Sequence, residues 1–172
     1  MMKAIVRTCW EICLLRQGPQ IFPRSRSLFA VMLMAYLAVD AILFAVQGIR
    51  GFLIVSETLF DTALLLVFFT LVLAIWRKPG RFNQTAVALF GTGALIMIAA
   101  LPPSLVATLL PSSPVTEAAK ALLYVVLAWS IFVMGHVTRH ALDTGLFTGT
   151  VIAVAYTLLN LVLFAVFFPI KG

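Results

Sequence analysis

The chain has 172 residues, of which 63% are apolar and only 10% are charged, and its mean hydropathy is +1.12. A soluble domain is about half apolar and about a quarter charged, so this composition excludes a water-soluble globular protein. The net charge of +6 does not indicate nucleic-acid binding, because the cations cluster where loops adjoin apolar runs. The sequence therefore predicts an all-α, polytopic membrane helical bundle.

The first 26 residues have a helical pattern ahead of the membrane domain, which we expect to span residues 27–172. The charged face of this pattern consists of Lys3, Arg7 and Glu11. Its apolar face consists of Ile5, Cys9, Ile12 and Cys13. This pattern predicts a short amphipathic interfacial helix in the cytoplasmic headgroup region. A frayed basic tail is the alternative, since about four turns are marginal for a helix in water.

Five apolar runs follow that are long enough to cross a hydrocarbon core of about 30 Å. We expect transmembrane helices at about residues 27–47, 52–76, 83–101, 117–137 and 146–168. Pro102 and Pro103 are expected to break the third, which leaves residues 104–110 as an interfacial turn on the outer face. Thr116 is expected to cap the fourth helix, and residues 136–145 are expected to form a loop.

The basic loop Trp76-Arg77-Lys78-Pro79-Gly80-Arg81-Phe82 indicates the orientation. If the N-terminus is cytoplasmic, nine of the 12 lysines and arginines lie in cytoplasmic segments, as the positive-inside rule requires. The C-terminus is then external. The cations that we expect to contact lipid headgroups are Lys3, Arg7, Arg24, Arg26, Arg77, Lys78 and Arg81.

Four polar residues lie inside the predicted spans: Asp40, Glu57, Asp61 and Asn160. Counted from the outer loops, they lie in the outer half of the membrane. One interpretation is a polar pocket that binds a cation, a proton or a lipid headgroup. The other is interhelical hydrogen bonding between neutral or paired side chains.

Two further pairs at a spacing of four do not predict a catalytic or metal site. His136 and His140 would need Asp143 as a third metal ligand, and a helix C-terminus explains them better. Cys9 and Cys13 are expected to make ordinary apolar contacts. A redox pair, acylation and half of a metal site are the alternatives. We expect no enzyme activity and no cofactor.

Small residues are expected to allow close helix packing, either within the chain or against a partner's membrane helix. They are Gly91 and Gly93 in the third span, and Gly145, Gly149 and Ala153 at the start of the fifth.

The layout resembles the Yip family of small five-span membrane proteins that interact with Rab-type GTPases. The residues that carry the resemblance are Arg16-Gln17-Gly18-Pro19-Gln20, followed by Phe22-Pro23 and Ser25 before the first span. The resemblance implies a non-enzymatic adaptor or membrane-organising factor of a bacterial inner membrane. Its partners would be lipid, another membrane protein or a second copy of the chain. The alternative is a small transporter or ion-handling component that uses the intramembrane carboxylates.

Overall fold

The computed structural model describes residues 2–111 and 113–168, and these residues form helices joined by short loops. The elements are α1 (Met2–Cys13), η1 (Pro19–Ile21), α2 (Arg26–Val46), α3 (Phe52–Ile75), η2 (Pro79–Arg81), α4 (Phe82–Leu109), α5 (Pro114–Leu142) and α6 (Leu146–Phe167). Helices α2 to α6 are long and apolar enough to cross a membrane. The predicted all-α membrane bundle, with five spans and a short N-terminal helix, is confirmed.

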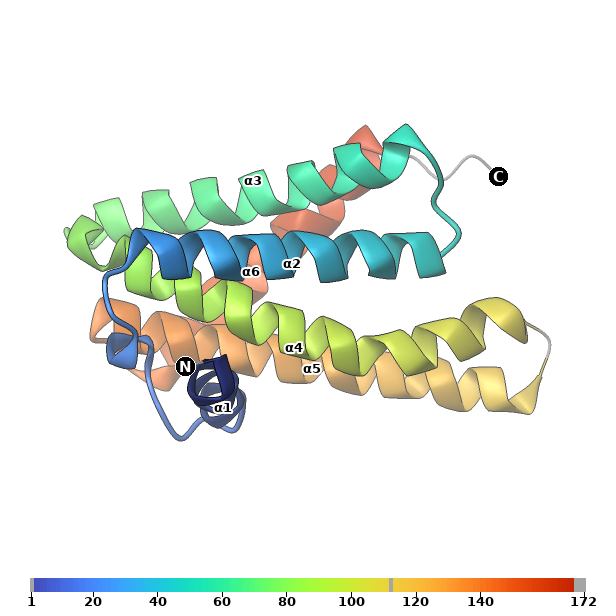
Figure 1. Cartoon of the computed structure of the whole chain (residues 1–172), viewed down its shortest axis with the longest axis horizontal. Helices are drawn as coiled ribbons and strands as arrows, with labels where there is room; N and C mark the ends of the chain where they lie inside the picture. Colours follow the sequence, from blue (N-terminus) through green and yellow to red (C-terminus); the bar gives the residue numbers. More distant parts are fainter. Residues whose placement is uncertain (1, 112, 169–172) are drawn as a thin grey trace.

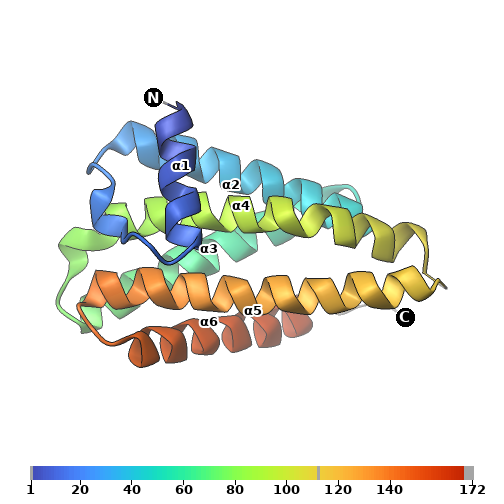
Figure 2. The same cartoon turned by 90° about the horizontal axis from the view of Figure 1, so that it is seen from below.

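Helix α4 lies at the centre of the bundle. In its most apolar stretch 61% of the residues are buried, against 11% in α6. Helices α2 and α5 pack on either side of α4, α3 packs against α2, and α6 packs against α5 (Figures 1 and 2). Helices α3 and α6 make much less contact with each other than α5 makes with α6.

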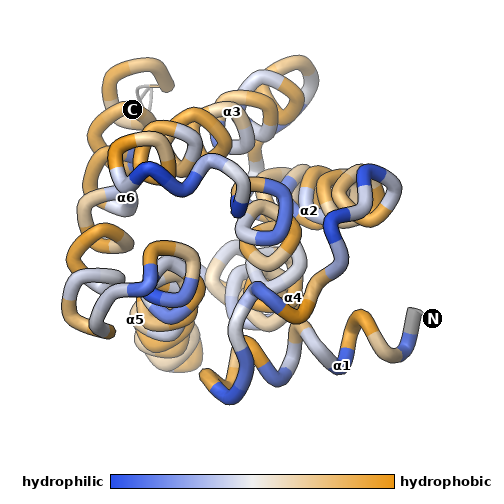
Figure 3. Tube along the Cα trace, turned by 90° about the vertical axis from the view of Figure 1, so that its left-hand side faces the viewer, coloured by the Kyte–Doolittle hydropathy of each residue, from blue (hydrophilic) through white to orange (hydrophobic). Residues whose placement is uncertain are grey.

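The outer surface of the bundle is apolar. Large side chains that are more than 70% exposed include Phe52, Ile75, Leu109, Tyr124 and Phe147. The view along the bundle from the end that carries the basic loop shows hydrophobic residues on all five long helices, with hydrophilic residues at the near loops (Figure 3). Such an extensive apolar surface would be unstable in water but suits a hydrocarbon solvent. The chain is an integral membrane protein.

The prolines of α4 do not break the helix, which corrects the sequence prediction. Helix α4 continues through Pro102 and Pro103 to Leu109. Each proline removes one backbone donor, but the segment that follows lies alongside the first turns of α5 (Figures 1 and 2). Pro103 and Ser104 are buried there, and so is Thr116 of α5. Packing between the two helices offsets the cost of the prolines, so the predicted interfacial turn at 104–110 is wrong.

Helix α5 is longer than predicted at both ends. Its N-cap is Ser113 rather than Thr116, because the Ser113 hydroxyl accepts a hydrogen bond from the Val115 amide and Pro114 occupies the first turn. At the other end the helix continues to Leu142, so the loop predicted for 136–145 shrinks to Asp143–Gly145. His136 is therefore a helical residue, and it is only 1% exposed.

Candidate functional site

A cavity of about 310 Å³ lies inside the bundle between α2, α3, α4, α5 and α6. Most of its lining is apolar. The polar side chains that line it are Tyr36, Asp61, Thr92, Ser130, Tyr156, Thr157 and Asn160. Five consecutive spans thus line one partly open space. Its volume is at the lower end of the range of about 300–1,000 Å³ for small-molecule pockets.

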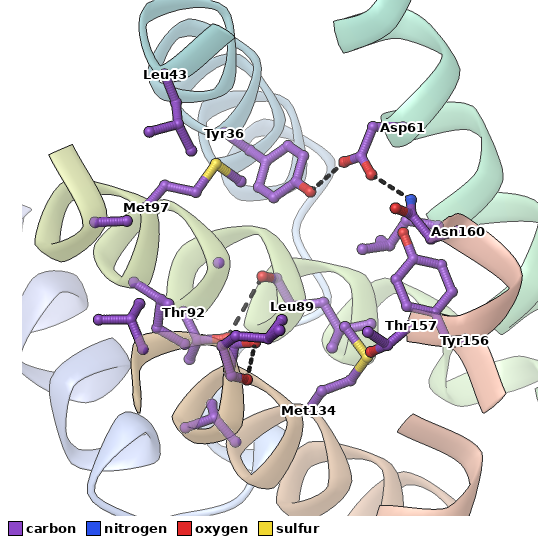
Figure 4. Close-up of a pocket in the computed structure, with 18 of the residues that line it drawn as sticks. Tyr36, Leu43, Asp61, Leu89, Thr92, Met97, Met134, Tyr156, Thr157 and Asn160 are labelled. Carbon is purple, nitrogen blue, oxygen red and sulfur yellow. Dashed lines mark hydrogen bonds between the residues drawn. The ribbon is translucent and has the colours of Figure 1, made fainter. Parts of the chain in front are cut away.

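Asp61 is the carboxylate of this cavity, and two other helices hold it in place. The Tyr36 hydroxyl of α2 donates to Asp61 Oδ2 at 2.6 Å, and the Asn160 amide of α6 donates to Asp61 Oδ1 at 2.8 Å (Figure 4). Both donors are neutral, so they orient the carboxyl group without balancing its charge. The bridge also connects α3 to α6, two helices that otherwise make few contacts.

A glycine of α4 leaves room for the tyrosine of this bridge. A Cβ atom on Gly93 would lie 2.8 Å from Cε2 of Tyr36, which is closer than side-chain atoms approach. Gly93, predicted as a helix-packing residue, thus admits the ring that reaches Asp61. Without this close approach the Tyr36 hydroxyl could not occupy its present position.

Several buried oxygens around the bridge make no hydrogen bond to the described residues. They are Asp40 Oδ2, Thr58 Oγ1, Thr62 Oγ1 and Tyr156 Oη. All four residues are only 5% exposed. Buried polar atoms in proteins are nearly always paired, and of these four oxygens only the Tyr156 hydroxyl belongs to a residue that lines the cavity.

The four predicted intramembrane residues do not all contribute in the same way. Asp61 and Asn160 contact each other and line the cavity, whereas Asp40 and Glu57 are buried outside its lining. Sequence reasoning missed Tyr36 and Tyr156. Tyr36 lies four residues before Asp40, and Tyr156 lies four before Asn160, so one helical turn relates each tyrosine to a polar residue that was identified.

The other predicted packing residues lie at different contacts. Gly91 faces α1, because its Cβ would lie 2.6 Å from Cys9 Sγ. Gly149 and Ala153 are buried where α6 meets α5. Gly145 corrects the prediction, since it is the N-cap of α6 and a Cβ there would meet nothing within 4 Å.

The basic loop binds the C-terminus of α5. Lys78 Nζ donates to the Leu142 carbonyl oxygen and to Asp143 Oδ2, both at 2.6 Å. Arg81 donates to Asp143 Oδ1 at 2.7 Å and to the carbonyl oxygens of His140 and Ala141, each at 3.1 Å. These cations therefore satisfy the last acceptors of the helix. The sequence predicted that Lys78 and Arg81 would contact lipid headgroups. In the structure both also bind the end of α5.

This arrangement also determines the surroundings of the two histidines. Asp143 faces Lys78 and Arg81, so it is not directed towards a metal that His136 and His140 could share. His136 Nε2 instead lies 2.8 Å from the Gln17 carbonyl oxygen. His140 lies in the last turn of α5, where the sequence argument expected a helix C-terminus.

We expect Asp143→Asn to lower the thermal stability at neutral pH and to remove part of its acid dependence. Hydrogen bonds from Arg81 and Lys78 lower the pKa of Asp143 below its usual value. The stabilisation is therefore complete above the unfolded-state pKa of about 3.9 and is lost as the pH falls further. Asparagine tolerates the left-handed conformation at this position, where φ is 54°.

Thermal unfolding of the purified protein in detergent, between about pH 7 and about pH 3, measures this effect. Glu117→Gln is the control, because the exposed Glu117–Lys120 pair contributes little. If Asp143→Asn had the acid profile of the unmodified protein, the ion pairs would not stabilise α5.

Helix α1 packs on the protein rather than with its apolar face towards lipid. Cys9, Ile12 and Cys13 are at most 2% exposed and lie against α4 and α5. Trp129 of α5 donates to the Cys13 carbonyl oxygen at 3.0 Å. The cysteines make the apolar contacts that the sequence predicted, and both are free thiols.

The segment after α1 is held across the ends of α4 and α5. Gln84 of α4 donates to the carbonyl oxygen of Phe22 at 2.7 Å and to that of Gln20 at 3.2 Å. Gln20 in turn donates to the His140 carbonyl oxygen of α5 at 2.9 Å. The segment quoted for the Yip resemblance thus makes specific contacts with the bundle.

Comparison with known proteins gives no independent assignment. No protein-family model, no curated protein and no solved structure matches the chain. The resemblance to the Yip family stays a prediction.

Proposed function

We propose that this protein is a small transport or ion-handling component of a membrane, with the central cavity as its substrate site. The observation that carries the proposal is Asp61, a carboxylate inside an apolar bundle that faces a cavity of about 310 Å³. An ionisable group at such a position is costly in hydrocarbon, and in membrane proteins it marks ion and substrate pathways.

Interhelical hydrogen bonding alone explains neither the cavity nor the position of the Tyr156 hydroxyl. The bridge from Tyr36 and Asn160 to Asp61 requires no empty space, yet a cavity extends from it. Nor does the bridge use the Tyr156 hydroxyl, which is buried beside it without a partner (Figure 4). A substrate site accounts for the carboxylate, the cavity and the free hydroxyl together.

The proposal includes the orientation and the membrane. Arg24 just before α2, Arg26 at the first residue of α2 and the loop that carries Lys78 and Arg81 lie at one end of the bundle (Figure 1). The positive-inside rule supports a cytoplasmic location for this end, with the N-terminus inside and the C-terminus outside. We propose a bacterial inner membrane, on the basis of the family resemblance and the short loops.

Side-specific cysteine labelling tests whether the cavity is a substrate pathway. Thr157 lines the cavity, so Thr157→Cys should react with a membrane-impermeant, cationic thiosulfonate added from at least one side of sealed vesicles. The reason is that the cysteine thiolate attacks the thiosulfonate, which forms a mixed disulfide and releases sulfinate, and the thiolate forms where water reaches the sulfur. We expect a rate at least about tenfold above that of Val162→Cys on the same helix.

Val162 is the matched control because it is 60% exposed on the outer surface of α6, where hydrocarbon surrounds it. Both variants should elute as monodisperse protein before they are compared. Equal labelling of the two cysteines from both sides would mean that water does not reach the cavity, and the transport proposal would be wrong.

The adaptor function remains a second candidate because of the outward face of α1. Val6 is 48% and Trp10 is 50% exposed, and both lie beside Lys3 and Arg7. A basic face with an exposed tryptophan suits an anionic lipid surface or an acidic partner. Co-purification in mild detergent tests it: a partner that is retained by the unmodified protein should be lost when Lys3 and Arg7 are both replaced by glutamate.

A further inference from the structure

The charge of the cavity lining is unbalanced. Asp61 is the only carboxyl group among the lining residues of the described structure, and lysine, arginine and histidine do not occur among them. Burying an unpaired carboxylate is expensive, so proteins pair such a group or keep it neutral. Here the missing positive charge has a place to bind, because the carboxylate faces an open volume.

The Asp61 carboxylate can accept further hydrogen bonds, so a ligand with several donors could bind there. An ionised carboxylate offers about four lone-pair sites, and Tyr36 and Asn160 use one on each oxygen. The Tyr156 hydroxyl, on a residue that is 5% exposed, lies next to them without a partner (Figure 4). An ammonium group, with its several N–H donors, can use both Asp61 and Tyr156.

The aromatic rings add a second attraction for a positive charge. Tyr36 and Tyr156 both line the cavity, and they approach it from α2 and α6 on the two sides of Asp61 (Figure 4). A cation near the face of a tyrosine ring is stabilised by about 0.5–2 kcal/mol, with the larger values where water is excluded.

The rest of the cavity calls for an apolar body. Away from Asp61 the lining consists mainly of Leu89, Ile96, Met97, Leu123, Leu127 and Met134. Methionine adapts its shape to irregular ligands. An inorganic divalent cation fits poorly, since it needs about six or more oxygen ligands. The described residues contain no group of three metal-ligating side chains.

We propose that the cavity binds a monovalent organic cation, with an ammonium head at Asp61 between Tyr36 and Tyr156 and an apolar body along α4 and α5. The inference rests on the proposed function, because it identifies the substrate class of the same cavity. It goes further in requiring the positive charge, which a site for neutral apolar molecules would not recognise.

Three probes that share one body separate charge from hydrophobicity: 2-phenylethylammonium, 2-phenylethanol and phenylacetate. Binding is measured by calorimetry with the full chain in lipid nanodiscs at neutral pH, with empty nanodiscs as the blank. We expect the ammonium to bind at least about tenfold more tightly than the alcohol, which corresponds to about 1.4 kcal/mol. The acid should not bind measurably.

Two variants tie this preference to the site. Asp61→Asn should weaken the ammonium at least about tenfold and leave the alcohol within about twofold. Tyr156→Phe removes only a hydroxyl without a partner, so the protein should fold normally and bind the ammonium about threefold more weakly. This second variant keeps the test decisive if Asp61→Asn does not fold.

Equal affinity for the ammonium and the alcohol would overturn the inference, as would a preference that Tyr156→Phe and Asp61→Asn both leave unchanged. Absence of binding by all three probes would overturn it as well. None of these results would change the labelling of Thr157→Cys, so a failure of the substrate class is distinguishable from a failure of the transport function.

Discussion

Replacing Gly149 by alanine is expected to lower the free energy of unfolding by about 1–3 kcal/mol, the usual cost of overpacking a core. A Cβ at this position would fall on the Gly135 carbonyl oxygen and would lie 2.9 Å from the Arg139 amide nitrogen. Both atoms belong to the backbone of α5 and cannot rotate away. The whole α6 helix would therefore have to move from α5.

Gly145→Ala is the matched control, because it adds the same methyl group four residues earlier, at the N-cap of the same helix. A Cβ at Gly145 meets nothing within 4 Å, and its φ of −71° is open to any residue. We expect a change within about 0.5 kcal/mol. Thermal unfolding in detergent, followed by size-exclusion chromatography, compares the two. If both substitutions were equally mild, α5 and α6 would not pack as closely as the structure places them.

This pair also shows what a regular spacing can predict. Gly145, Gly149 and Ala153 form one stripe in the sequence. The structure shows a close approach to α5 at Gly149, and Ala153 is fully buried. The stripe could not show that Gly145 lies before the first turn of α6. A stripe of small residues gives the face of a helix, whereas the position of the neighbouring helix depends on tertiary packing.

Most of the fold could be predicted because hydropathy and length determine membrane spans. The starts and ends of α2, α3 and α6 agree with the expected spans to within about two residues. The errors came at α4 and α5, where local signals were opposed by packing. Pro102 and Pro103 normally end a helix, and only contact with α5 explains why α4 continues.

The candidate site was predictable only in part, for a related reason. Asp61 and Asn160 were both identified as polar residues inside a predicted span. Tyrosine is common in membrane spans and near their ends, so Tyr36 and Tyr156 gave no signal by composition. Their role follows from the positions of α2 and α6 around the cavity. The sequence alone does not give those positions.

Sequence reasoning also missed the contact between the basic loop and Asp143. Lys78 and Arg81 were assigned to lipid because short cytoplasmic loops are usually basic. Asp143 lies more than 60 residues away, in a loop that the sequence argument made longer than it is. Lys78 and Arg81 thus contribute both to the charge bias from which the orientation is predicted and to the capping of α5.

Gly91→Leu is expected to make the two native cysteines reactive, because it should displace α1 from the bundle. A Cβ on Gly91 would lie 2.6 Å from Cys9 Sγ and 3.3 Å from Met32 Sδ, and leucine adds three more carbons. In the docked helix burial raises the pKa of Cys9 to about 11 and that of Cys13 to about 12. An exposed cysteine has a pKa of about 8.5.

Release of α1 should therefore increase the thiolate fraction near neutral pH by more than about 100-fold, and the rate of maleimide labelling should rise accordingly. Gly80→Leu is the control, since a Cβ there meets nothing within 4 Å. The chain contains only these two cysteines, so the label reports on α1 alone. Slow labelling of a folded Gly91→Leu protein, at the rate of the control, would show that α1 is not held in the contact between Cys9 and Gly91.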